Sequence, residues 1–205
     1  MNIIKVFFIL SHLLWLNTFF LSSQKNHVNT NKADWIDFNK NGIQDVYEDP
    51  AKELDERVED LLSQMTLEEK TCQMVTLYGF GRVLEDELPT ENWKNKPWKD
   101  GIGNIDEHLS NTTFRSQTNT KYSYPYSRHA EAINIIQKWF IEETRLGIPV
   151  DFTVEGIRGL AHDRATSFPA NIGLGSTWNK ELAYQMGQVI GKEAKALGYT
   201  NVYAP

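Results

Sequence analysis

The sequence predicts an α/β protein whose parallel β-sheet is either open or closed into a barrel. Residues 150–155 alternate apolar and polar side chains, which is the pattern of a strand with one buried face. Amphipathic helices are predicted before and after this strand, and another strand begins in the segment NVYAP at residues 201–205. Strands that alternate with helices in this way are typical of a parallel sheet.

Composition narrows the possible partners. The 205 residues are 40% hydrophobic and 12% aromatic, which is enough for a buried core. Because 27 acidic residues outnumber 21 basic ones, the net charge is −6, and the chain has no general attraction for the phosphates of nucleic acid. No nucleic-acid partner is expected. The single cysteine, Cys72, excludes an internal disulfide and a thiolate metal cluster.

Residues 1–23 have the features of a secretory signal peptide. Lys5 supplies a positive start, residues 6–20 are mostly apolar, and two serines at 22–23 mark a cleavage point. The alternative is a membrane anchor, because the stretch approaches the roughly 20 residues that a spanning helix needs. Polar residues interrupt it, so we expect cleavage, no stable membrane insertion, and export to the periplasm or the extracellular space. Residues 24–33 form a short polar linker.

Residues 34–50 contain an EF-hand-like calcium loop. The segment fits the pattern D-x-[DN]-x-[DN]-G-x5-E at every specified position, and Gly42 permits its sharp turn. Gln44 and Pro50 depart from paired EF-hands, so the loop resembles the isolated loops of extracellular proteins. The alternative is an Asn/Gly/Asp turn that binds nothing. The predicted ligands of a structural Ca²⁺ are Asp37, Asn39, Asn41, the carbonyl of Ile43, Asp45 and Glu48.

Residues 51–80 are predicted to form N-terminal helices. The first carries an apolar stripe made of Leu54, Val58, Leu61, Leu62 and Met65. A second helix is predicted to begin after Thr66, because Thr66 and Glu69 form a capping box.

Residues 81–128 form an aromatic-rich excursion that contains one short predicted strand, in the run GIGNI at residues 101–105. A long irregular stretch inside a compact domain is usually functional. Its aromatic side chains either stack on a ring-shaped ligand such as a sugar or, as most aromatics do, pack in the core. These side chains are Trp93, Trp98, Tyr122, Tyr124 and Tyr126.

Residues 129–205 are predicted to contain the next βα units. Apolar residues at helical spacing from Ala132 to Ile141 predict a helix that Gly147 ends, and the strand at residues 150–155 follows. A second helix is predicted from about Asn179 to Leu197, before NVYAP. His108, His129 and His162 show no metal-ligand spacing and are expected at the surface or beside a site.

Several segments together resemble the family 3 glycoside hydrolases, and most closely their exported bacterial β-glucosidase-like members. The segments are MTLEEKTCQM, DGIGNI, RLGIPVDFTVEGIRG, TSFPANIGLGSTWNKEL and EAKALGYTNVYAP. The resemblance covers most of the chain after the linker. It implies a (β/α)₈ TIM-type barrel whose first strand is DGIGNI, followed by an α/β sandwich domain, and it implies that this sequence is an N-terminal fragment.

The resemblance also implies an activity. Family members hydrolyse β-linked oligosaccharides with retention, using an Asp nucleophile and a separate acid/base carboxylate, and need no catalytic cofactor. Both carboxylates are expected downstream of Pro205, so the fragment contains no catalytic residue and is expected to be inactive alone. A β-xylosidase of the same family is one alternative. A noncatalytic, calcium-stabilised carbohydrate-binding module is another.

Glu155 and Arg158 are the predicted substrate-binding residues. Glu155 stands where most family members have Asp, and Arg158 where many have His. Glu155 ends its predicted strand, at the barrel face where active sites assemble. Asp151 lies four residues back, roughly 13 Å along the strand, whereas a retaining carboxyl pair is about 5 to 5.5 Å apart. Glu155 is therefore expected to bind sugar hydroxyls and not to act as acid, base or nucleophile.

Overall fold

The computed structural model describes residues 35–111 and 120–204. The chain divides into two units, Met1–Ile36 and Asp37–Pro205, and every helix and strand named below lies in the second. The predicted signal peptide and linker lie outside the described residues. Among the residues that are described, no helix has the length and apolar character needed to cross a bilayer.

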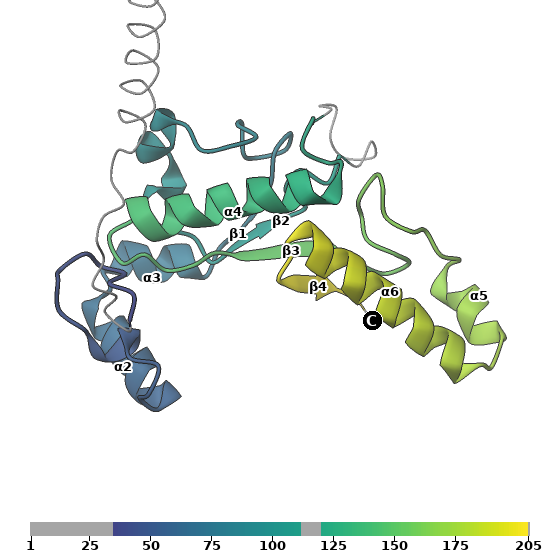
Figure 1. Cartoon of the computed structure of the whole chain (residues 1–205), viewed down its shortest axis with the longest axis horizontal. Coiled ribbons are helices and arrows are strands. Elements are labelled where there is room, and N and C mark those ends of the chain that lie inside the picture. The colour runs from purple at the N-terminus through teal and green to yellow at the C-terminus, as the bar shows by residue number, and fades with distance from the viewer. Residues whose placement is uncertain (1–34, 112–119, 205) are drawn as a thin grey trace, which may run out of the picture. The chain divides into compact units, whose positions relative to one another are not determined.

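Four short strands form one parallel sheet in the order β1-β2-β3-β4, which confirms the predicted sheet. The strands are β1 (Thr76–Tyr78), β2 (Asn104–Asp106), β3 (Asp151–Glu155) and β4 (Asn201–Tyr203). Helix α4 (Tyr126–Glu143) leads from β2 to β3, and helix α6 (Lys180–Leu197) leads from β3 to β4 (Figure 1).

One face of the sheet is apolar and packs on α4 and α6. Ile105, Phe152 and Val154 on this face are each at most 1% exposed. The helix residues that join them in the core are Ile133, Ile136, Phe140, Ile190, Ala194 and Leu197. Because burying one such large apolar side chain stabilises a fold by about 1.5 to 3 kcal/mol, this layer is a main source of stability.

The helix ends follow local sequence signals. Helices α2 (Leu54–Gln64) and α3 (Leu67–Gln73) occupy the predicted helical region, and Thr66 and Glu69 form the predicted capping box in front of α3. The Asn179 side chain caps the start of α6. Gly198 ends α6 at φ 92°, a left-handed conformation that glycine adopts without strain.

Three elements differ from the prediction. Strand β1 was not expected, since its three residues are partly exposed and too few to show alternation. The strand predicted in GIGNI lies later, at Asn104–Asp106. Helix α5 (Asn171–Ser176) was also not expected, because its six residues include two glycines, which are poor helix formers.

The tryptophans of the excursion belong to the core. Trp93 and Trp98 lie on the short 3₁₀ helices η2 (Glu91–Asn95) and η3 (Pro97–Asp100), and are 0% and 5% exposed. Trp93 packs edge-on against Trp98 and against Trp139 of α4, with ring centroids 5.7 and 5.2 Å apart. Neither Trp93 nor Trp98 is available to stack on a ligand. For these two residues, packing in the core is the correct alternative.

The histidines are buried, so the first of the two expected placements, at the surface, is wrong. His108, His129 and His162 are 0%, 0% and 5% exposed. The rings of His129 and His162 lie 5.2 Å apart, and Tyr199 packs on His129 at 5.1 Å. Spacing along the chain does not reveal this cluster, because the loops after β2 and β3 and the start of α4 meet only in the folded protein.

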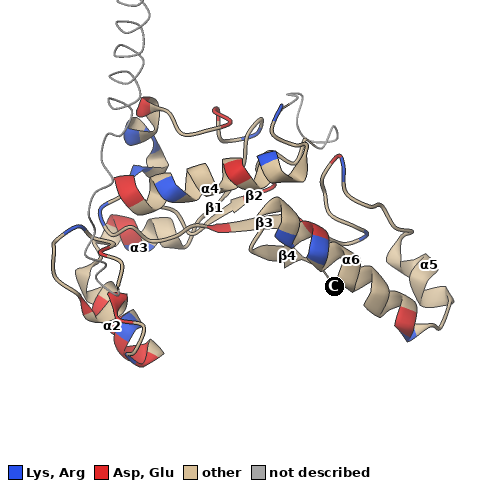
Figure 2. Ribbon diagram, in the orientation of Figure 1, with Lys and Arg blue, Asp and Glu red and all other residues tan. Residues whose placement is uncertain are grey.

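Charged side chains of both signs are interspersed. Figure 2 shows Lys and Arg among Asp and Glu along α4 and α6, with neither sign covering a whole helix. A continuous basic stripe, the usual footprint of a nucleic-acid-binding surface, is not visible on these two helices.

Candidate functional site

The second face of the sheet is polar on every strand. In the parallel register Asp106 is opposite Thr153, and Glu155 is opposite Tyr203. Since side chains alternate along a strand, the residues opposite the apolar core share this face. They are Thr76, Tyr78, Asn104, Asp106, Asp151, Thr153, Glu155, Asn201 and Tyr203. The predicted polar face of β3 is therefore one part of a polar surface that runs across the whole sheet.

The carboxyl ends of the four strands meet at one edge, because the strands are parallel. Tyr78, Asp106, Glu155 and Tyr203 are the last residues of their strands. Active sites of barrels and of open parallel sheets assemble at this edge. Glu155 ends β3, as the sequence predicts, and it is half-buried at this edge. We call these four residues and their loops the carboxyl edge.

A chain of hydrogen bonds crosses the polar face from Asp151 to Asp106. Asn104 Nδ2 donates to Asp151 Oδ2 over 3.0 Å. Thr153 Oγ1 lies 2.9 Å from Asn104 Oδ1 and 3.0 Å from Asp106 Oδ1. Asp106 is 3% exposed and Thr153 is 0% exposed. Burial raises the pKa of the Asp106 carboxyl, and the negative charge of Glu155 adds to this effect.

Arg82 and Glu107 complete the carboxyl edge, although the sequence did not single them out. The Arg82 guanidinium lies 3.0 Å from the centre of the Tyr78 ring, and its Nη1 forms a 3.1 Å ion pair with Glu107 Oε2. The Glu107 side chain is only 5% exposed. A usable signal was present for Glu107, which directly follows β2, whereas Arg82 follows β1, a strand that the sequence does not reveal.

Arg158 does not join Glu155. It is exposed, and its backbone carbonyl accepts a hydrogen bond from the Phe168 N–H over 2.9 Å. Among the ion pairs of residues 35–111 and 120–204, none links Arg158 to Glu155. The structure therefore places Glu155 at the carboxyl edge and gives Arg158 no contact that would orient it there.

The predicted calcium ligands form one compact loop. The side-chain amides of Asn39 and Asn41 both donate to Asp45 Oδ2, over 2.6 and 2.8 Å. Asp37 accepts from the N–H groups of Asn41 and Gly42 over 3.1 and 2.9 Å. A half-turn of each Asn amide would turn its oxygen toward Asp45, but it would break the bonds that Asn39 Oδ1 and Asn41 Oδ1 accept from the N–H groups of Asn41 and Ile43, over 3.1 and 2.7 Å.

Glu48 is held differently. It is 3% exposed, and its carboxylate accepts from the N–H groups of Phe38, Asn39 and Asp45 over 2.7, 3.4 and 3.1 Å. The N–H of Ile43 donates to the Asn41 side chain. In the described part of the chain, no three His, Cys, Asp or Glu side chains gather in a way that could hold a metal ion. Asp37, Asn39, Asn41 and Asp45 thus offer the oxygen atoms that calcium prefers, whereas Glu48 would have to leave three backbone donors.

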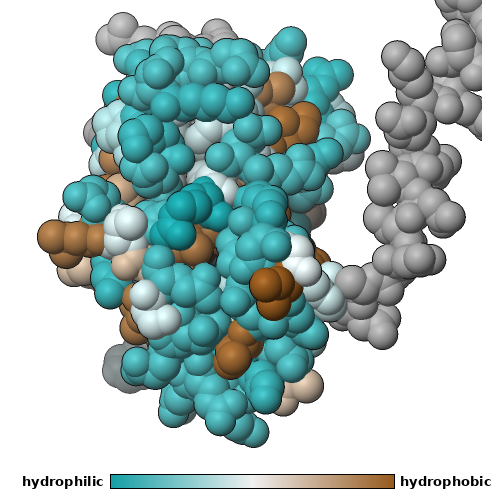
Figure 3. All heavy atoms as spheres, turned by 90° about the vertical axis from the view of Figure 1, so that its left-hand side faces the viewer, coloured by the Kyte–Doolittle hydropathy of each residue, from teal (hydrophilic) through white to brown (hydrophobic). Residues whose placement is uncertain are grey.

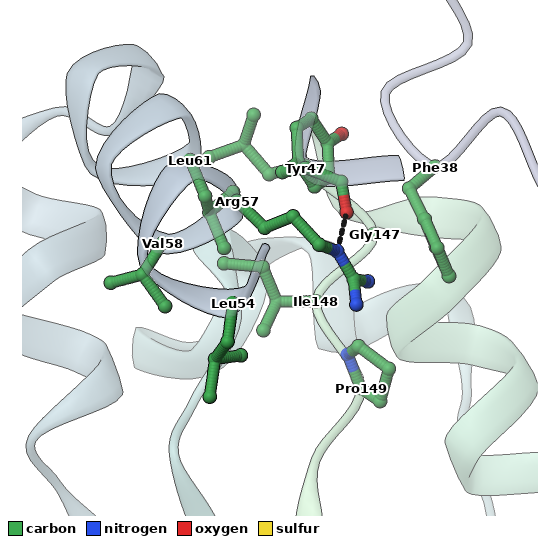
Figure 4. Close-up of a pocket in the computed structure, with 10 residues that line it drawn as sticks. Phe38, Tyr47, Leu54, Arg57, Val58, Leu61, Gly147, Ile148 and Pro149 are labelled. Atoms are coloured by element: carbon green, nitrogen blue, oxygen red, sulfur yellow. Dashed lines mark hydrogen bonds between the residues drawn. The ribbon is translucent and has the colours of Figure 1, made fainter. Parts of the chain in front are cut away.

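The loop is fastened to the body of the second unit at two places. Lys40 Nζ donates to the carbonyls of Ile141 and Thr144 at the end of α4, over 2.7 and 2.6 Å. Beside it, Phe38 and Tyr47 line a cavity of about 270 Å³ together with α2 and residues 146–149, and Arg57 Nε donates to the Tyr47 carbonyl over 3.0 Å (Figure 4). Figure 3 shows this side of the molecule as mostly hydrophilic with separate hydrophobic patches.

Comparison with known proteins decides the family. Residues 53–205 match the profile of the Glycosyl hydrolase family 3 N terminal domain. The chain belongs to glycosyl hydrolase family 3. The resemblance found in the sequence is thereby confirmed, and the parallel sheet with its helices belongs to the TIM-barrel-like α/β fold of that domain.

Curated family 3 relatives carry two kinds of name. A putative beta-xylosidase from Formosa agariphila is 29% identical over 78% of this chain, and beta-glucosidase C from Emericella nidulans is 28% identical over 75%. The lysosomal beta glucosidase of Dictyostelium discoideum is 26% identical over 72% of the chain. This chain spans only about a fifth to a quarter of the length of these relatives, at 20%, 24% and 18%.

Solved structures support the fold. A β-glucosidase from Erythrobacter marinus superposes with a TM-score of 0.61 at 22% identity, and the match covers 78% of this chain and 19% of that one. An exo-1,3/1,4-beta-glucanase from a Pseudoalteromonas species gives a TM-score of 0.52 at 24% identity, over 83% of this chain and 25% of that one.

Proposed function

We propose that this chain is part of a retaining glycosidase that acts on β-linked oligosaccharides, with β-glucosides as the preferred substrates. Membership of family 3 supports glycoside hydrolysis, and the names of the relatives favour a β-glucoside or a β-xyloside. The observation that carries the proposal is the placement of Glu155 at the carboxyl edge of a parallel sheet in a family 3 chain.

The role proposed for this chain is substrate binding. A carboxylate such as Glu155 accepts hydrogen bonds from two sugar hydroxyls at once. The nucleophile and the acid/base are proposed to lie outside these residues, for two reasons. Asp151 is four residues from Glu155 on the same strand, roughly 13 Å away, which is too far for a retaining pair. Asp106 is closer but is turned onto Thr153 and only 3% exposed, so it is shielded from a leaving-group oxygen.

The purified full-length protein, assayed with matched aryl β-glucoside and aryl β-xyloside, tests this function. We expect release of the aryl group with retention at the anomeric carbon, and a higher kcat/KM for the glucoside. The reverse preference would make the protein a β-xylosidase. Sugar binding without any hydrolysis would favour the noncatalytic carbohydrate-binding module and contradict the proposal.

The 205-residue chain purified alone is expected to hydrolyse neither substrate, because the proposed catalytic carboxylates are not among its residues. The same aryl glycoside assay checks this, with preparations from a host that lacks β-glycosidases. Turnover by the isolated chain would show that the carboxylates have been placed wrongly.

We further propose a structural Ca²⁺ held by Asp37, Asn39, Asn41, the Ile43 carbonyl, Asp45 and Glu48. A bound cation would neutralise these oxygens and hold the loop together, while Lys40 fastens the loop to the end of α4. Isolated extracellular loops bind calcium with a Kd of about 10⁻⁴ to 10⁻³ M. Since binding to the native state alone stabilises it by mass action, millimolar Ca²⁺ is expected to raise the melting temperature.

Calorimetry in calcium and in chelator measures this increment in melting temperature. Asp37→Asn should reduce the increment, because it removes one charge from the donor set and keeps an acceptor for the loop N–H groups. Asp49→Asn is the matched control and should keep the increment, since Asp49 directly follows the last predicted ligand, Glu48, and its carboxylate accepts from the Ala51 N–H. Equal melting temperatures in calcium and chelator for the unmodified protein would leave the loop as a turn that binds nothing.

Export is proposed from the sequence of residues 1–23 alone. N-terminal sequencing of the native protein is expected to begin near Gln24. A native chain that still begins at Met1 in a membrane fraction would favour the anchor.

A further inference from the structure

The hydrogen-bond chain on the polar face has one proton too few if every carboxyl is ionised. The Thr153 hydroxyl carries a single hydrogen, yet its oxygen lies 2.9 Å from Asn104 Oδ1 and 3.0 Å from Asp106 Oδ1. It can donate to only one of them. The oxygen left over would then face the Thr153 oxygen at hydrogen-bond distance with no hydrogen between the two.

Rotation of the Asn104 amide does not remove the shortage. Asn104 Nδ2 donates to Asp151 Oδ2 over 3.0 Å, so a rotated amide would bring its oxygen against that carboxylate. The orientation of Asn104 is therefore fixed by Asp151. Water cannot easily supply the missing hydrogen either, because Asn104, Thr153 and Asp106 are 9%, 0% and 3% exposed.

We propose that Asp106 is a neutral carboxylic acid in the folded protein at neutral pH, and that it acts as a positioning residue by donating its proton to Thr153 Oγ1. Every side chain in this series of hydrogen bonds then has a donor for each acceptor that it faces. Asp106 donates to Thr153, Thr153 donates to Asn104 Oδ1, and Asn104 donates to the ionised Asp151. Each donor points away from the carboxyl edge, so the hydrogen bonds run from Asp106 at the end of β2 to Asp151 at the start of β3.

The charges around Asp106 agree with a retained proton. Burial and the neighbouring Glu155 raise the pKa of Asp106, while the Thr153 hydroxyl, Arg82 and the Glu107 N–H act in the opposite direction. Arg82 is already paired with the Glu107 carboxylate over 3.1 Å, which weakens its pull on Asp106. Tyr199 also lies near these acids, and burial, together with the charge of Glu107, raises its own pKa.

A neutral Asp106 has a consequence for substrate binding, and that consequence rests on the proposed function. Two ionised carboxylates at the ends of neighbouring strands repel each other. With Asp106 protonated, Glu155 presents its charge to sugar hydroxyls without that repulsion. Thr153, two residues before Glu155 on the same face, is held in one rotamer by its two hydrogen bonds and fixes the strand that carries Glu155.

The test compares the matched variants Asp106→Asn and Asp151→Asn in the full-length protein, by melting temperature from pH 5 to 8. The amide of Asp106→Asn can still donate to Thr153 and no longer has to hold a proton. An unfolded Asp loses its proton near pH 4, so retention in the folded state costs stability as pH rises above this value. We therefore expect Asp106→Asn to melt higher than the unmodified protein, by a margin that widens as pH rises.

Asp151→Asn is expected to melt lower at every pH, because its NH₂ replaces either the oxygen that accepts from Asn104 and Asn201 or the oxygen that accepts from Thr200. Infrared spectroscopy of the unmodified protein at neutral pH should show the carbonyl band of a protonated carboxylic acid, and Asp106→Asn should lack it.

A lower melting temperature for Asp106→Asn, most marked at neutral pH, overturns the proposal. If the variants do not fold, absence of the band in the unmodified protein overturns it as well. Neither readout needs hydrolysis. A protein that shows the band but has no glycosidase activity would support this inference and contradict the proposed function.

Discussion

Replacing Glu155 by Gln in the full-length protein is expected to lower kcat/KM for a β-glucoside by several-fold to about a thousandfold. Each charge-assisted hydrogen bond to a sugar hydroxyl contributes about 1.5 to 3 kcal/mol, and about 1.4 kcal/mol corresponds to a factor of ten. Gln keeps one acceptor and the size of the side chain but loses the charge. The loss should appear in kcat as well as in KM, because contacts that strengthen in the transition state raise kcat.

Glu131→Gln is the matched control for Glu155→Gln. Glu131 is exposed on α4 and is not one of the strand residues that form the polar face, so its replacement should leave kcat/KM unchanged. Azide tests separately whether Glu155 is a catalytic carboxylate or a substrate-binding one. Recovery of activity of the Glu155 variant with azide would identify Glu155 as a catalytic carboxylate, and an unchanged kcat/KM would remove it from the substrate-binding site.

The free energy of unfolding is expected to fall steeply as pH drops from 6.5 to about 4, because the buried histidines are neutral in the folded protein. Burial lowers the pKa of His108 to about 3 and that of His162 to about 4, and it also lowers the pKa of His129. An unfolded His has a pKa near 6.5. The unfolded state therefore binds more protons between these values, and each of His108 and His162 adds a slope approaching roughly 1.4 kcal/mol per pH unit.

The geometry of His108 explains why it resists protonation. Its Nδ1 accepts from the Phe80 N–H over 3.0 Å, and its Nε2 lies 3.0 Å from the Glu87 carbonyl, to which only an N–H can bond. A second proton on Nδ1 would point at the Phe80 N–H. Gly79 packs directly on the backbone of His108, so the loop has no room to turn the ring outward.

Urea denaturation at several pH values between 7 and 4.5 measures the slope. This window lies above the titration of most carboxyl groups, whose unperturbed pKa values are about 3.9 to 4.3. His108→Asn keeps an acceptor for Phe80 and cannot titrate, so it should be less stable at pH 7 and show a shallower slope. Stability that is flat over the window, or an equal slope in the variant, would contradict the neutral histidine cluster.

The predictable part of the structure is the part with regular patterns. The apolar residues of α4, the cap at Asn179 and the stop at Gly198 are local signals, and the alternation in β3 separates its faces without knowledge of its neighbours. Strand β1 carries too few residues to show a period. Its position depends on pairing with β2, which is a tertiary interaction.

The candidate site was predictable only where one residue stands at a recognisable strand end. Glu155 met that condition. Asp106 and Arg82 belong to the same edge, but they come from segments with little periodicity and reach it through the parallel register and the ion pair with Glu107. Arg158 was predicted to bind substrate because it lies close to Glu155 in sequence, whereas the turn after β3 leaves its side chain exposed.

A crystal structure of the full-length protein with a β-glucoside analogue tests the central claim most directly, because it locates the sugar relative to the sheet. We expect the ring at the carboxyl ends of β2 and β3, with both oxygens of Glu155 within hydrogen-bond distance of sugar hydroxyls. A sugar bound at the opposite edge of the sheet, or at the carboxyl edge with Glu155 turned away from it, would contradict the account.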